Sequence, residues 1–503
     1  MNKKIIILSL FLIIAIGGFF RLYQLSNQSY WMDEGYTINA VISGQENGFT
    51  KKGSSILDSG RNYSCPIYCL PTAYITKIFG NNAFSYRFLS VISGILFILI
   101  IFYITRRMFN YRIAILSSFF VSFSYWQIAW SRQARWYTLF ALFFWLALYF
   151  FYKSLYSEKN KYLNIIFTTV FTITAILTHS LGYLLPLIFI GWILINQIFI
   201  QKKFNWKKSL IVIFSGAIAL WLLNFILSVD ILGYLFNTFQ LHYTLPYYLS
   251  FYLRNYWLFI VLALIAFFDK HNSYKKETYF LLFTFATYFI SLSFFTDIVH
   301  YRYLFHVMPV LFILGSLGIL NLQKEIKSRY GKIILWIAIL GLFATIAGGT
   351  FLPQVNYYLE SDNPETLGNR PYYAYTPQPD WNSAYTFIEE NKTAEEIIIS
   401  SHPHFNKIFL NEAGYWIKYN YLGMEDTPNI IENDQEYYVG AKVIDDLAEL
   451  QLIITNSHGY IIFDYMAIDG KIPQEIINYI VKNTKEVFHE KTNAFSQVWI
   501  YKF

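Results

Sequence analysis

Tyr30-Trp31-Met32-Asp33-Glu34-Gly35-Tyr36 follows directly on the first apolar run of the chain, Ile5–Phe20. Two adjacent carboxylates therefore lie at the edge of a membrane, flanked by aromatic residues of the kind that prefer the headgroup level. Charges so close to hydrocarbon are costly, which makes these acids candidates for function. The competing interpretation is a helix end whose acidic residues are solvated at the interface. The rest of the sequence favours the functional interpretation.

The composition indicates a polytopic membrane protein. Of the 503 residues, 55% are hydrophobic, 21% are aromatic and only 14% are charged, whereas soluble domains carry about 25% charge. The formal net charge of +7 has to be interpreted by its location along the chain. We therefore expect no nucleic-acid partner.

A membrane-spanning helix needs about 20 mostly apolar residues, and about eleven segments meet that requirement. The predicted spans cover residues 5–25, 87–105, 112–130, 137–152, 162–178, 183–200, 208–228, 255–268, 278–296, 303–321 and 332–351. No broken helix and no internal repeat is expected from this pattern. The first span is expected to stay uncleaved, because Gly17–Arg21 is a poor match to a signal cleavage site.

Basic residues predict the orientation. They gather in alternate connections, at residues 106–112, 153–161, 202–208, 270–276 and 324–332. Positively charged loops stay in the cytoplasm, so we expect a multi-pass protein of the plasma membrane with a cytoplasmic N-terminus. Everything after Phe351 is then external.

The predicted external face brings ionisable groups to one membrane edge. It carries the first loop, 26–86, and the segments 131–135, 178–180, 228–254 and 296–302. Cations and acids gathered at one depth suit a site for an anionic lipid headgroup.

The first external loop is expected to be an ordered layer on the membrane, because it is rich in aromatic and aliphatic residues. Glu34–Val41 is expected to form an interfacial helix, 58–63 a turn, and the segment from Cys65 to Gly80 a second amphipathic element. A disulfide between Cys65 and Cys69 is left open, since their spacing alone does not decide it.

From Pro353 the chain becomes more polar and richer in proline. We expect a transmembrane domain over 1–352, a linker over 353–380 and an external α/β domain over 381–503. Within that last domain the predicted helices are 381–391 and 473–482, and the predicted strands are 396–400, 450–455, 460–463 and 498–501. His402 and His404 are expected at the surface, since no third metal ligand is apparent.

The chain resembles the polytopic glycosyltransferases of the GT-C superfamily. It is most similar to the branch of dolichyl-phosphate-mannose–protein mannosyltransferases and lipid A aminoarabinose transferases (glycosyltransferase family 39-like). The resemblance covers about residues 1–320. It is carried by Arg21-Leu22 with Trp31–Gly35, by Pro66–Tyr68 through 78–90 to 106–109, by Ser131–Leu139 and, more weakly, by Thr178–Ser180 and Tyr301–Leu304.

The resemblance implies an α-helical polytopic membrane protein with the GT-C fold, about eleven transmembrane helices and a small C-terminal external α/β domain. It also implies inverting transfer of a sugar from a polyprenyl-phosphate carrier to a protein, lipid or cell-envelope glycan acceptor on the outer face. Asp33 matches the family's catalytic acidic position. Its carboxylate is expected to act as the base that takes the proton of the acceptor hydroxyl. Glu34 is its neighbour and is expected to orient the acceptor or nearby backbone.

The leaving polyprenyl phosphate needs cations as its charge develops. The candidate phosphate ligands are Arg132, Arg135, His179 and Arg302, and the candidate substrate contacts are Tyr36, Tyr137 and Tyr301. Competing interpretations have Arg135 pairing with a membrane lipid phosphate and His179 capping a helix end. They also place Trp136 and Tyr137 among the interface aromatics.

The sequence departs from the family in two places. Family members often have a double proline where this chain has Cys65-Pro66. Metal-using relatives carry a further acid in the second external loop, whereas Ser131–Arg135 has none. We therefore expect no metal site and no cofactor, although a divalent metal is not excluded.

Two other functional classes compete with the transferase. A transporter, flippase or polymerase of lipid-linked glycans would also bind a polyprenyl phosphate, but transporters tend to show broken helices and internal repeats. A membrane-anchored binding protein would work through its external domain. Deleting residues 353–503 and assaying transfer distinguishes it from the enzyme.

Overall fold

The computed structural model describes residues 3–47, 65–200, 241, 243–295, 300–326, 328–346, 352–357, 379–418, 431–432, 434–436, 439–468, 472–490 and 497–503. The chain divides into two compact units. The first comprises Met1–Tyr23, Leu89–Arg132 and Trp136–Gln354. The second comprises Gln24–Phe88, Gln133–Arg135 and Val355–Phe503.

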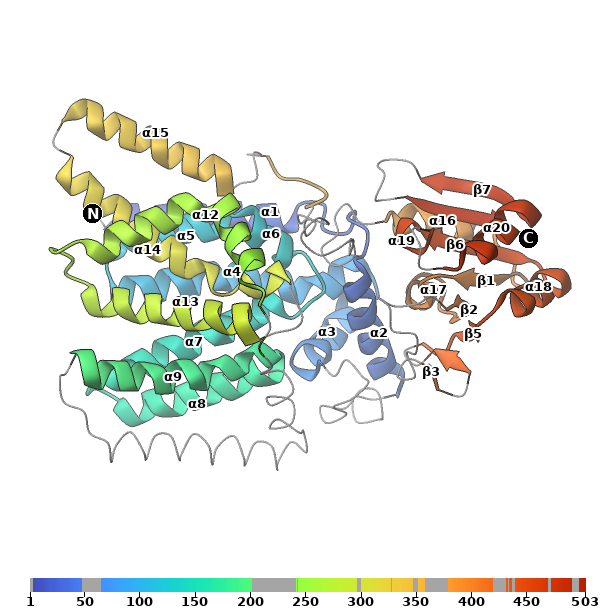
Figure 1. Ribbon diagram of the computed structural model, residues 1–503, viewed down its shortest axis with the longest axis horizontal. Coiled ribbons are helices and arrows are strands. Elements are labelled where there is room, and N and C mark those ends of the chain that lie inside the picture. Colours follow the sequence, from blue (N-terminus) through green and yellow to red (C-terminus); the bar gives the residue numbers. More distant parts are fainter. Residues whose placement is uncertain are drawn as a thin grey trace. The chain divides into compact units, whose positions relative to one another are not determined.

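The first unit is helical (Figure 1). Its helices are α1 (Lys3–Leu22), most of α4 (Ala83–Met108), α5 (Tyr111–Phe123), α6 (Tyr125–Ser131), α7 (Tyr137–Tyr156), α8 (Lys161–Thr178), η1 (Ser180–Tyr183), α9 (Leu184–Ile195), η2 (Asn196–Ile200), α12 (Leu245–Phe268), α13 (Lys275–Phe295), η3 (Tyr301–Leu304), α14 (Met308–Glu325) and α15 (Arg329–Ile346). Helix α7 packs against α8, and α12 packs against α14.

Length and hydropathy confirm a multi-pass membrane protein. Among the described residues, seven helices are long and apolar enough to cross a membrane, or eight if the bent pair α5–α6 is one span. Helices α14 and α15 overlap the predicted spans 303–321 and 332–351. They are not among the seven helices that meet the length and hydropathy criteria. The predicted span 208–228 lies outside the described residues.

The span predicted over 112–130 is bent by 61° between α5 and α6, so the expectation of unbroken helices is wrong. Ser124 lies at the break with an extended backbone (φ −62°, ψ 120°). A break frees carbonyl groups at the end of α5. The buried guanidinium of Arg21 donates to two of them, those of Ser122 (3.0 Å) and Val121 (3.4 Å). A side chain from another helix thus stabilises the bend. The hydropathy of residues 112–130 alone therefore could not predict it.

The second unit contains seven helices among the described residues and one sheet (Figure 1). The helices are α2 (Met32–Asn47), α3 (Pro66–Phe79), α16 (Trp381–Asn391), α17 (Pro403–Leu410), α18 (Leu447–Asn456), α19 (Tyr465–Ile468) and α20 (Gln474–Asn483). The strands are β1 (Ile397–Ser400), β2 (Tyr415–Ile417), β3 (Ile431–Glu432), β4 (Gln435–Glu436), β5 (Lys442–Ile444), β6 (Gly459–Asp464), β7 (Lys485–Glu490) and β8 (Val498–Lys502).

The sheet has the strand order β3-β4-β5-β2-β1-β6-β8-β7. Strands β5, β2, β1 and β6 are parallel, and β4 and β8 flank them as antiparallel neighbours. The chain runs from β1 outward to β2 and β5, then returns to the other side of β1 to form β6. The strand order therefore reverses between β1 and β6, the place where open α/β sheets form a crevice beyond the carboxyl ends of their strands.

Most elements predicted for the C-terminal part are confirmed. Helices α16 and α20 and strands β1, β6 and β8 lie at the predicted positions. The strand predicted over 450–455 is wrong, because that segment is α18. Asp446 caps α18 by accepting from the backbone N–H of Glu449 (2.8 Å). A short apolar run does not by itself distinguish a strand from a helix. Residues 358–378 of the predicted linker lie outside the described part of the chain.

The first loop forms two helices. The helix predicted over 34–41 is the longer α2, and the segment predicted from Cys65 to Gly80 contains α3, which ends at Gly80 with φ +80°. The predicted turn at 58–63 lies outside the described residues. Cys65 and Cys69 are joined by a disulfide across the start of α3, which settles the pairing that the sequence left open.

Candidate functional site

The acidic pair lies in the first turn of α2. Asp33 and Glu34 occupy the positions where carboxylates favour a helix, because the N-terminal end of the helix dipole is positive. Glu34 Oε2 also accepts from the backbone N–H of Trp31 (3.0 Å). This is the glutamate half of a capping box, and it explains why α2 begins where it does.

Glu34 has four protein donors and no exposed surface. Arg87 donates to both of its oxygens, from Nε to Oε1 at 2.8 Å and from Nη2 to Oε2 at 2.9 Å. The backbone N–H of Ala134 donates to Oε1 at 2.6 Å, in addition to the bond from Trp31. Both side chains of the Glu34–Arg87 pair are 0% exposed. A buried bidentate pair of this kind is a structural anchor, so Glu34 orients backbone, one of the two roles expected for it.

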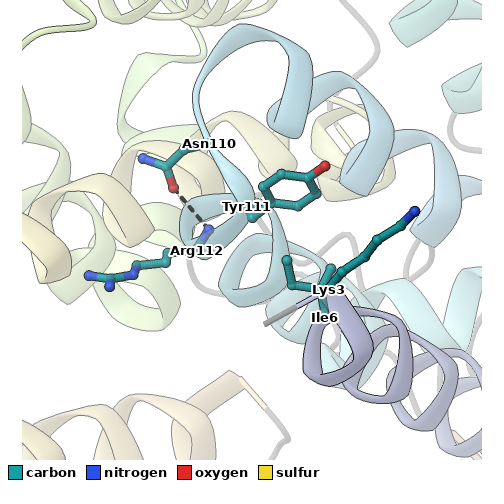
Figure 2. Close-up of a pocket in the computed structure, with 5 residues that line it drawn as sticks. All are labelled: Lys3, Ile6, Asn110, Tyr111 and Arg112. Atoms are coloured by element: carbon teal, nitrogen blue, oxygen red, sulfur yellow. Dashed lines mark hydrogen bonds between the residues drawn. The ribbon is translucent and has the colours of Figure 1, made fainter. Parts of the chain in front are cut away.

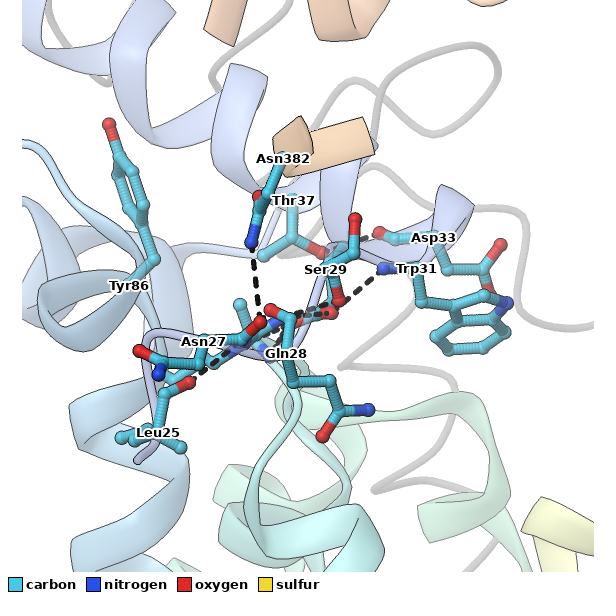
Figure 3. A network of polar contacts seen from close by, with 12 residues as sticks. Leu25, Asn27, Gln28, Ser29, Trp31, Asp33, Thr37, Tyr86 and Asn382 are labelled. Atoms are coloured by element: carbon cyan, nitrogen blue, oxygen red, sulfur yellow. Dashed lines mark hydrogen bonds and ion pairs between the residues drawn. The ribbon is translucent and has the colours of Figure 1, made fainter. Parts of the chain in front are cut away.

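Arg87 extends the anchor to the segment that precedes α2. Its Nη1 donates to the carbonyls of Leu25 (2.8 Å) and Gln28 (2.7 Å), and its Nη2 donates to that of Ser29 (3.0 Å). Figure 3 shows Leu25, Gln28 and Ser29 of this segment together with Trp31. The sequence analysis assigned no role to Arg87. The available signal was an arginine at the start of a predicted apolar span, which needs a buried partner.

Asp33 differs from Glu34 in exposure and in partners. Its side chain is 14% exposed, and Arg135 Nη2 lies 3.6 Å from its Oδ2. Arg135 is only 3% exposed, and its Nη1 donates to the Asp33 carbonyl (3.0 Å) and to the Thr37 hydroxyl (2.9 Å). Asp33 is therefore the more accessible carboxylate of the pair, and it lies beside a guanidinium.

His402 and His404 are both buried, at 3% exposure each, so the expectation that they lie at the surface is wrong. They begin α17 directly after β1. His402 pairs with Asp464 at the end of β6 (3.2 Å). The His404 ring lies 4.8 Å from that of Tyr36 in α2. Burial, together with the neighbouring His402, lowers the pKa of His404 well below its usual range.

Arg132, in the first unit, caps the end of α1. Its Nη1 donates to the carbonyls of Phe20 (3.2 Å), Arg21 (3.1 Å) and Tyr23 (2.8 Å). These groups belong to the last turn of the helix or follow it, where carbonyls lack intrahelical partners. Phosphate binding by Arg132 stays a prediction.

His179 caps a helix, as one of the two interpretations of this residue predicted. Its Nδ1 accepts from the backbone N–H of Leu181 at the start of η1 (3.1 Å). In the neutral ring the proton is therefore on Nε2. The ring lies 5.6 Å from that of Tyr137 and 5.9 Å from that of Tyr303. Tyr137 is 4% exposed, so its ring is enclosed by protein, and its interpretations as a substrate contact and as an interface aromatic stay predictions.

Arg302 and Tyr301 lie in η3. The Arg302 guanidinium is 5.7 Å from the Tyr303 ring. Tyr301 is 3% exposed and stacks on Tyr247, with the ring centroids 4.1 Å apart. Burial, and then the charge of Arg302, lowers the pKa of the preceding His300 well below its usual range. His300 is therefore neutral near pH 7.

The structure thus brings Asp33, Glu34, Tyr36 and Arg135 together in the second unit. The other candidates lie in the first unit, where Tyr137 and His179 are neighbours. In the described part of the chain, no group of three or more histidine, cysteine, aspartate or glutamate residues is close enough to hold a metal ion.

A cavity of about 450 Å³ lies elsewhere in the first unit (Figure 2). It is lined by Lys3, Ile6, Asn110, Tyr111 and Arg112. Asn110 caps α5 through the backbone N–H of Arg112 (2.9 Å). None of the predicted site residues lines this cavity, so it is not part of the candidate site.

Glu34→Gln is expected to destabilise the fold because it leaves the Arg87 guanidinium buried without a counter-charge. Breaking a buried pair from one side costs about 3–5 kcal/mol. The measurement is thermal unfolding of the detergent-purified protein.

Two variants serve as controls. Glu34→Gln combined with Arg87→Met removes both charges, so its loss should be smaller than the sum of the losses of the two single variants. Glu46→Gln breaks the more exposed pair with Lys407 (3.1 Å) and should unfold like the wild type. Wild-type melting of Glu34→Gln alone would show that the pair is not an anchor.

Comparison with known proteins supports the fold. Residues 65–226 match the family model described as dolichyl-phosphate-mannose-protein mannosyltransferase. No curated protein sequence gives a significant match. The structure matches that of ArnT from Cupriavidus metallidurans bound to undecaprenyl phosphate, with a TM-score of 0.62 at 13% identity. That match covers 98% of this chain and 97% of ArnT.

The structure also matches archaeal oligosaccharyltransferases. The Archaeoglobus fulgidus enzyme AglB, in complex with an inhibitory peptide and a dolichol-phosphate, gives a TM-score of 0.57 at 13% identity. The match covers 99% of this chain and 74% of AglB. Residues 65–226 are therefore similar in sequence to the dolichyl-phosphate-mannose-protein mannosyltransferases, and the chain is a polytopic membrane protein that shares its fold with ArnT and AglB.

Proposed function

We propose that the chain is an inverting glycosyltransferase that moves a sugar from a polyprenyl-phosphate carrier to a protein, lipid or cell-envelope glycan acceptor. The observation that carries the proposal is the asymmetry of the acidic pair. Glu34 is enclosed by four donors, whereas the Asp33 carboxylate is partly exposed and lies beside Arg135. One acid therefore holds the turn in place, and the other is available for chemistry.

Asp33 serves as the general base. An acceptor hydroxyl is a poor nucleophile, so a carboxylate takes its proton as the oxygen attacks the anomeric carbon. The new bond forms between the acceptor oxygen and that carbon while the bond from the carbon to the phosphate oxygen breaks. The proton goes to Asp33, the bonding pair leaves with the polyprenyl phosphate, and attack from the opposite face inverts the anomeric centre.

Cations stabilise the departing phosphate. Arg135 lies beside the proposed base, with its Nη2 3.6 Å from Asp33 Oδ2. In the proposal the other phosphate ligands are Arg132, His179 and Arg302, and the substrate contacts are Tyr36, Tyr137 and Tyr301. The structures of ArnT with undecaprenyl phosphate and of AglB with a dolichol-phosphate support a carrier of the same class here.

The proposed setting is the outer face of the plasma membrane. Alternation of basic loops supports a cytoplasmic N-terminus and an external C-terminal domain. The proposed catalytic domain is 1–352 with its first loop 26–86, followed by the linker 353–380 and the α/β domain 381–503. The acceptor then approaches from outside the cell.

The second candidate is a transporter, flippase or polymerase of lipid-linked glycans. The bend between α5 and α6 favours it, because broken helices are common in transporters. A transporter or flippase, however, moves its lipid-linked glycan without forming a glycosidic bond. The two functions therefore differ in whether the wild-type protein transfers the sugar from the donor to an acceptor.

Asp33→Asn is expected to lower the rate of sugar transfer by about 10²–10⁴-fold, because it keeps the size of the side chain and removes the base. Donor binding and thermal unfolding should stay close to wild type. The measurement is transfer of radiolabelled sugar from polyprenyl-phosphate donors to a cell-envelope extract, per folded molecule.

Glu46→Gln is the control, because it removes a more exposed carboxylate of the same helix. This variant should transfer sugar normally. Near-normal transfer by Asp33→Asn would exclude Asp33 as the base, whereas absence of transfer by the folded wild type would favour the transporter.

Arg135→Ala and Arg302→Ala are expected to weaken donor binding and slow departure of the carrier. One charge-assisted contact contributes about 1.5–3 kcal/mol, which corresponds to roughly a 10- to 100-fold loss. Titration with an unlabelled polyprenyl phosphate and single-turnover transfer measure the two effects. Unchanged binding and turnover in both variants would assign these arginines a structural role.

The proposed orientation is tested with Lys203→Cys and Lys471→Cys, introduced singly into a chain whose two native cysteines are paired. A membrane-impermeant maleimide applied to intact cells should label only the variant at 471, because 203 lies in a basic loop. Labelling at 203 in intact cells, or no labelling at 471 until the cells are opened, would overturn the orientation.

A further inference from the structure

Helix α17 of the C-terminal sheet domain packs directly on the first turn of α2. A Cβ atom added to Gly35 would overlap the His404 ring at Cδ2 and lie 2.8 Å from its Nε2. It would also lie 3.3 Å from Phe405 Cε1. The residue that follows the acidic pair is therefore a glycine at a point where no side chain fits against α17.

Hydrogen bonds join the same two helices. Asn39, one turn along α2, donates from Nδ2 to the Gly35 carbonyl (2.9 Å) and to the His404 carbonyl (3.0 Å). Asn39 is 5% exposed and His404 is 3% exposed. The Tyr36 ring also lies against the His404 ring, with the ring centroids 4.8 Å apart. The contact therefore fixes both the distance between the helices and the rotation of α2 about its axis.

The sheet fixes α17 in turn. Helix α17 starts at Pro403, directly after β1, at the point where the strand order reverses. His402 pairs with Asp464 (3.2 Å), and the Ser401 hydroxyl donates to the other oxygen of Asp464 (3.4 Å). All three side chains are almost completely buried. Open α/β sheets commonly bind ligands at this edge. In this chain the edge supports α17, which packs on α2.

We infer that the C-terminal sheet domain is part of the catalytic machinery, with His404 as a positioning residue that holds the α2 turn carrying Asp33. This inference rests on the proposed function of Asp33. His404 acts through the contact with Gly35 and Tyr36 and through its carbonyl bond to Asn39. The domain thus contributes to the rate of sugar transfer by holding Asp33 in position, apart from any contribution that it makes to binding the acceptor.

Gly35→Ala isolates this contact. Alanine favours a helix more than glycine does, so any loss arises from the overlap with His404 and not from α2 itself. A displacement of about 1 Å at a reacting group can cost on the order of 10²-fold in rate. We therefore expect Gly35→Ala to lower kcat by roughly 10- to 100-fold, with KM for the donor little changed.

His404→Ala removes the ring that α17 places on the turn and should also lower kcat. The double variant Gly35→Ala with His404→Ala has space for the new methyl group. It should be about as active as His404→Ala alone, and so lose much less than the two single losses combined, as expected of residues in direct contact. Lys407→Ala is the matched control, because Lys407 reaches α2 only through its more exposed pair with Glu46, and it should leave kcat unchanged.

Transfer kinetics per folded molecule and thermal unfolding are measured for all four variants of the full-length protein. A loss in the double variant smaller than the two single losses combined supports the inference, whether the single variants are folded and slow or fail to fold. Independent, additive effects in both measurements overturn it. Absence of transfer by the wild type would refute the proposed function instead, while the coupling in thermal unfolding would still decide whether the contact holds α2.

Discussion

The buried pair of Glu34 and Arg87 is the interaction on which the rest of the second unit depends. Two desolvated charges are tolerable only when each has good geometry and further hydrogen bonds. Here the remaining donors and acceptors are supplied by backbone from the segment before α2 and from Ala134. The pair therefore connects stretches that are far apart in the sequence, and no single stretch can move without leaving a buried charge unsatisfied.

The pair also gives the two acids separate tasks. If both carboxylates had to hold the turn and react, protonation during catalysis would loosen the structure that positions the reacting group. In the proposed function Glu34 stays within its closed set of donors while Asp33 takes the proton, so the start of α2 is not disturbed. Sites on rigid support hold a reacting group more closely than sites on loops do.

Much of the fold could be predicted because single elements carry their own signals. Apolar length predicted the helices, and caps or alternation predicted most of the C-terminal elements. Two of the misses depend on residues distant in the sequence. The bend after α5 needs Arg21, and the burial of His402 and His404 needs Asp464 and α2. For the site, separate roles for Asp33 and Glu34 could be predicted, but the complete burial of Glu34 could not, because Arg87 was not recognised as its partner.

The contact between Asn39 and His404 joins residues 365 positions apart, and it has a consequence for biosynthesis. Chains are made at about 5–20 residues per second, so α2 is complete roughly 20–70 s before α17 exists. During that interval the acidic turn has Arg87 and Ala134 within reach but lacks its support from the sheet. A ribosome-bound chain therefore holds its proposed base in an unfinished setting, and the site is completed only when almost the whole protein has been translated.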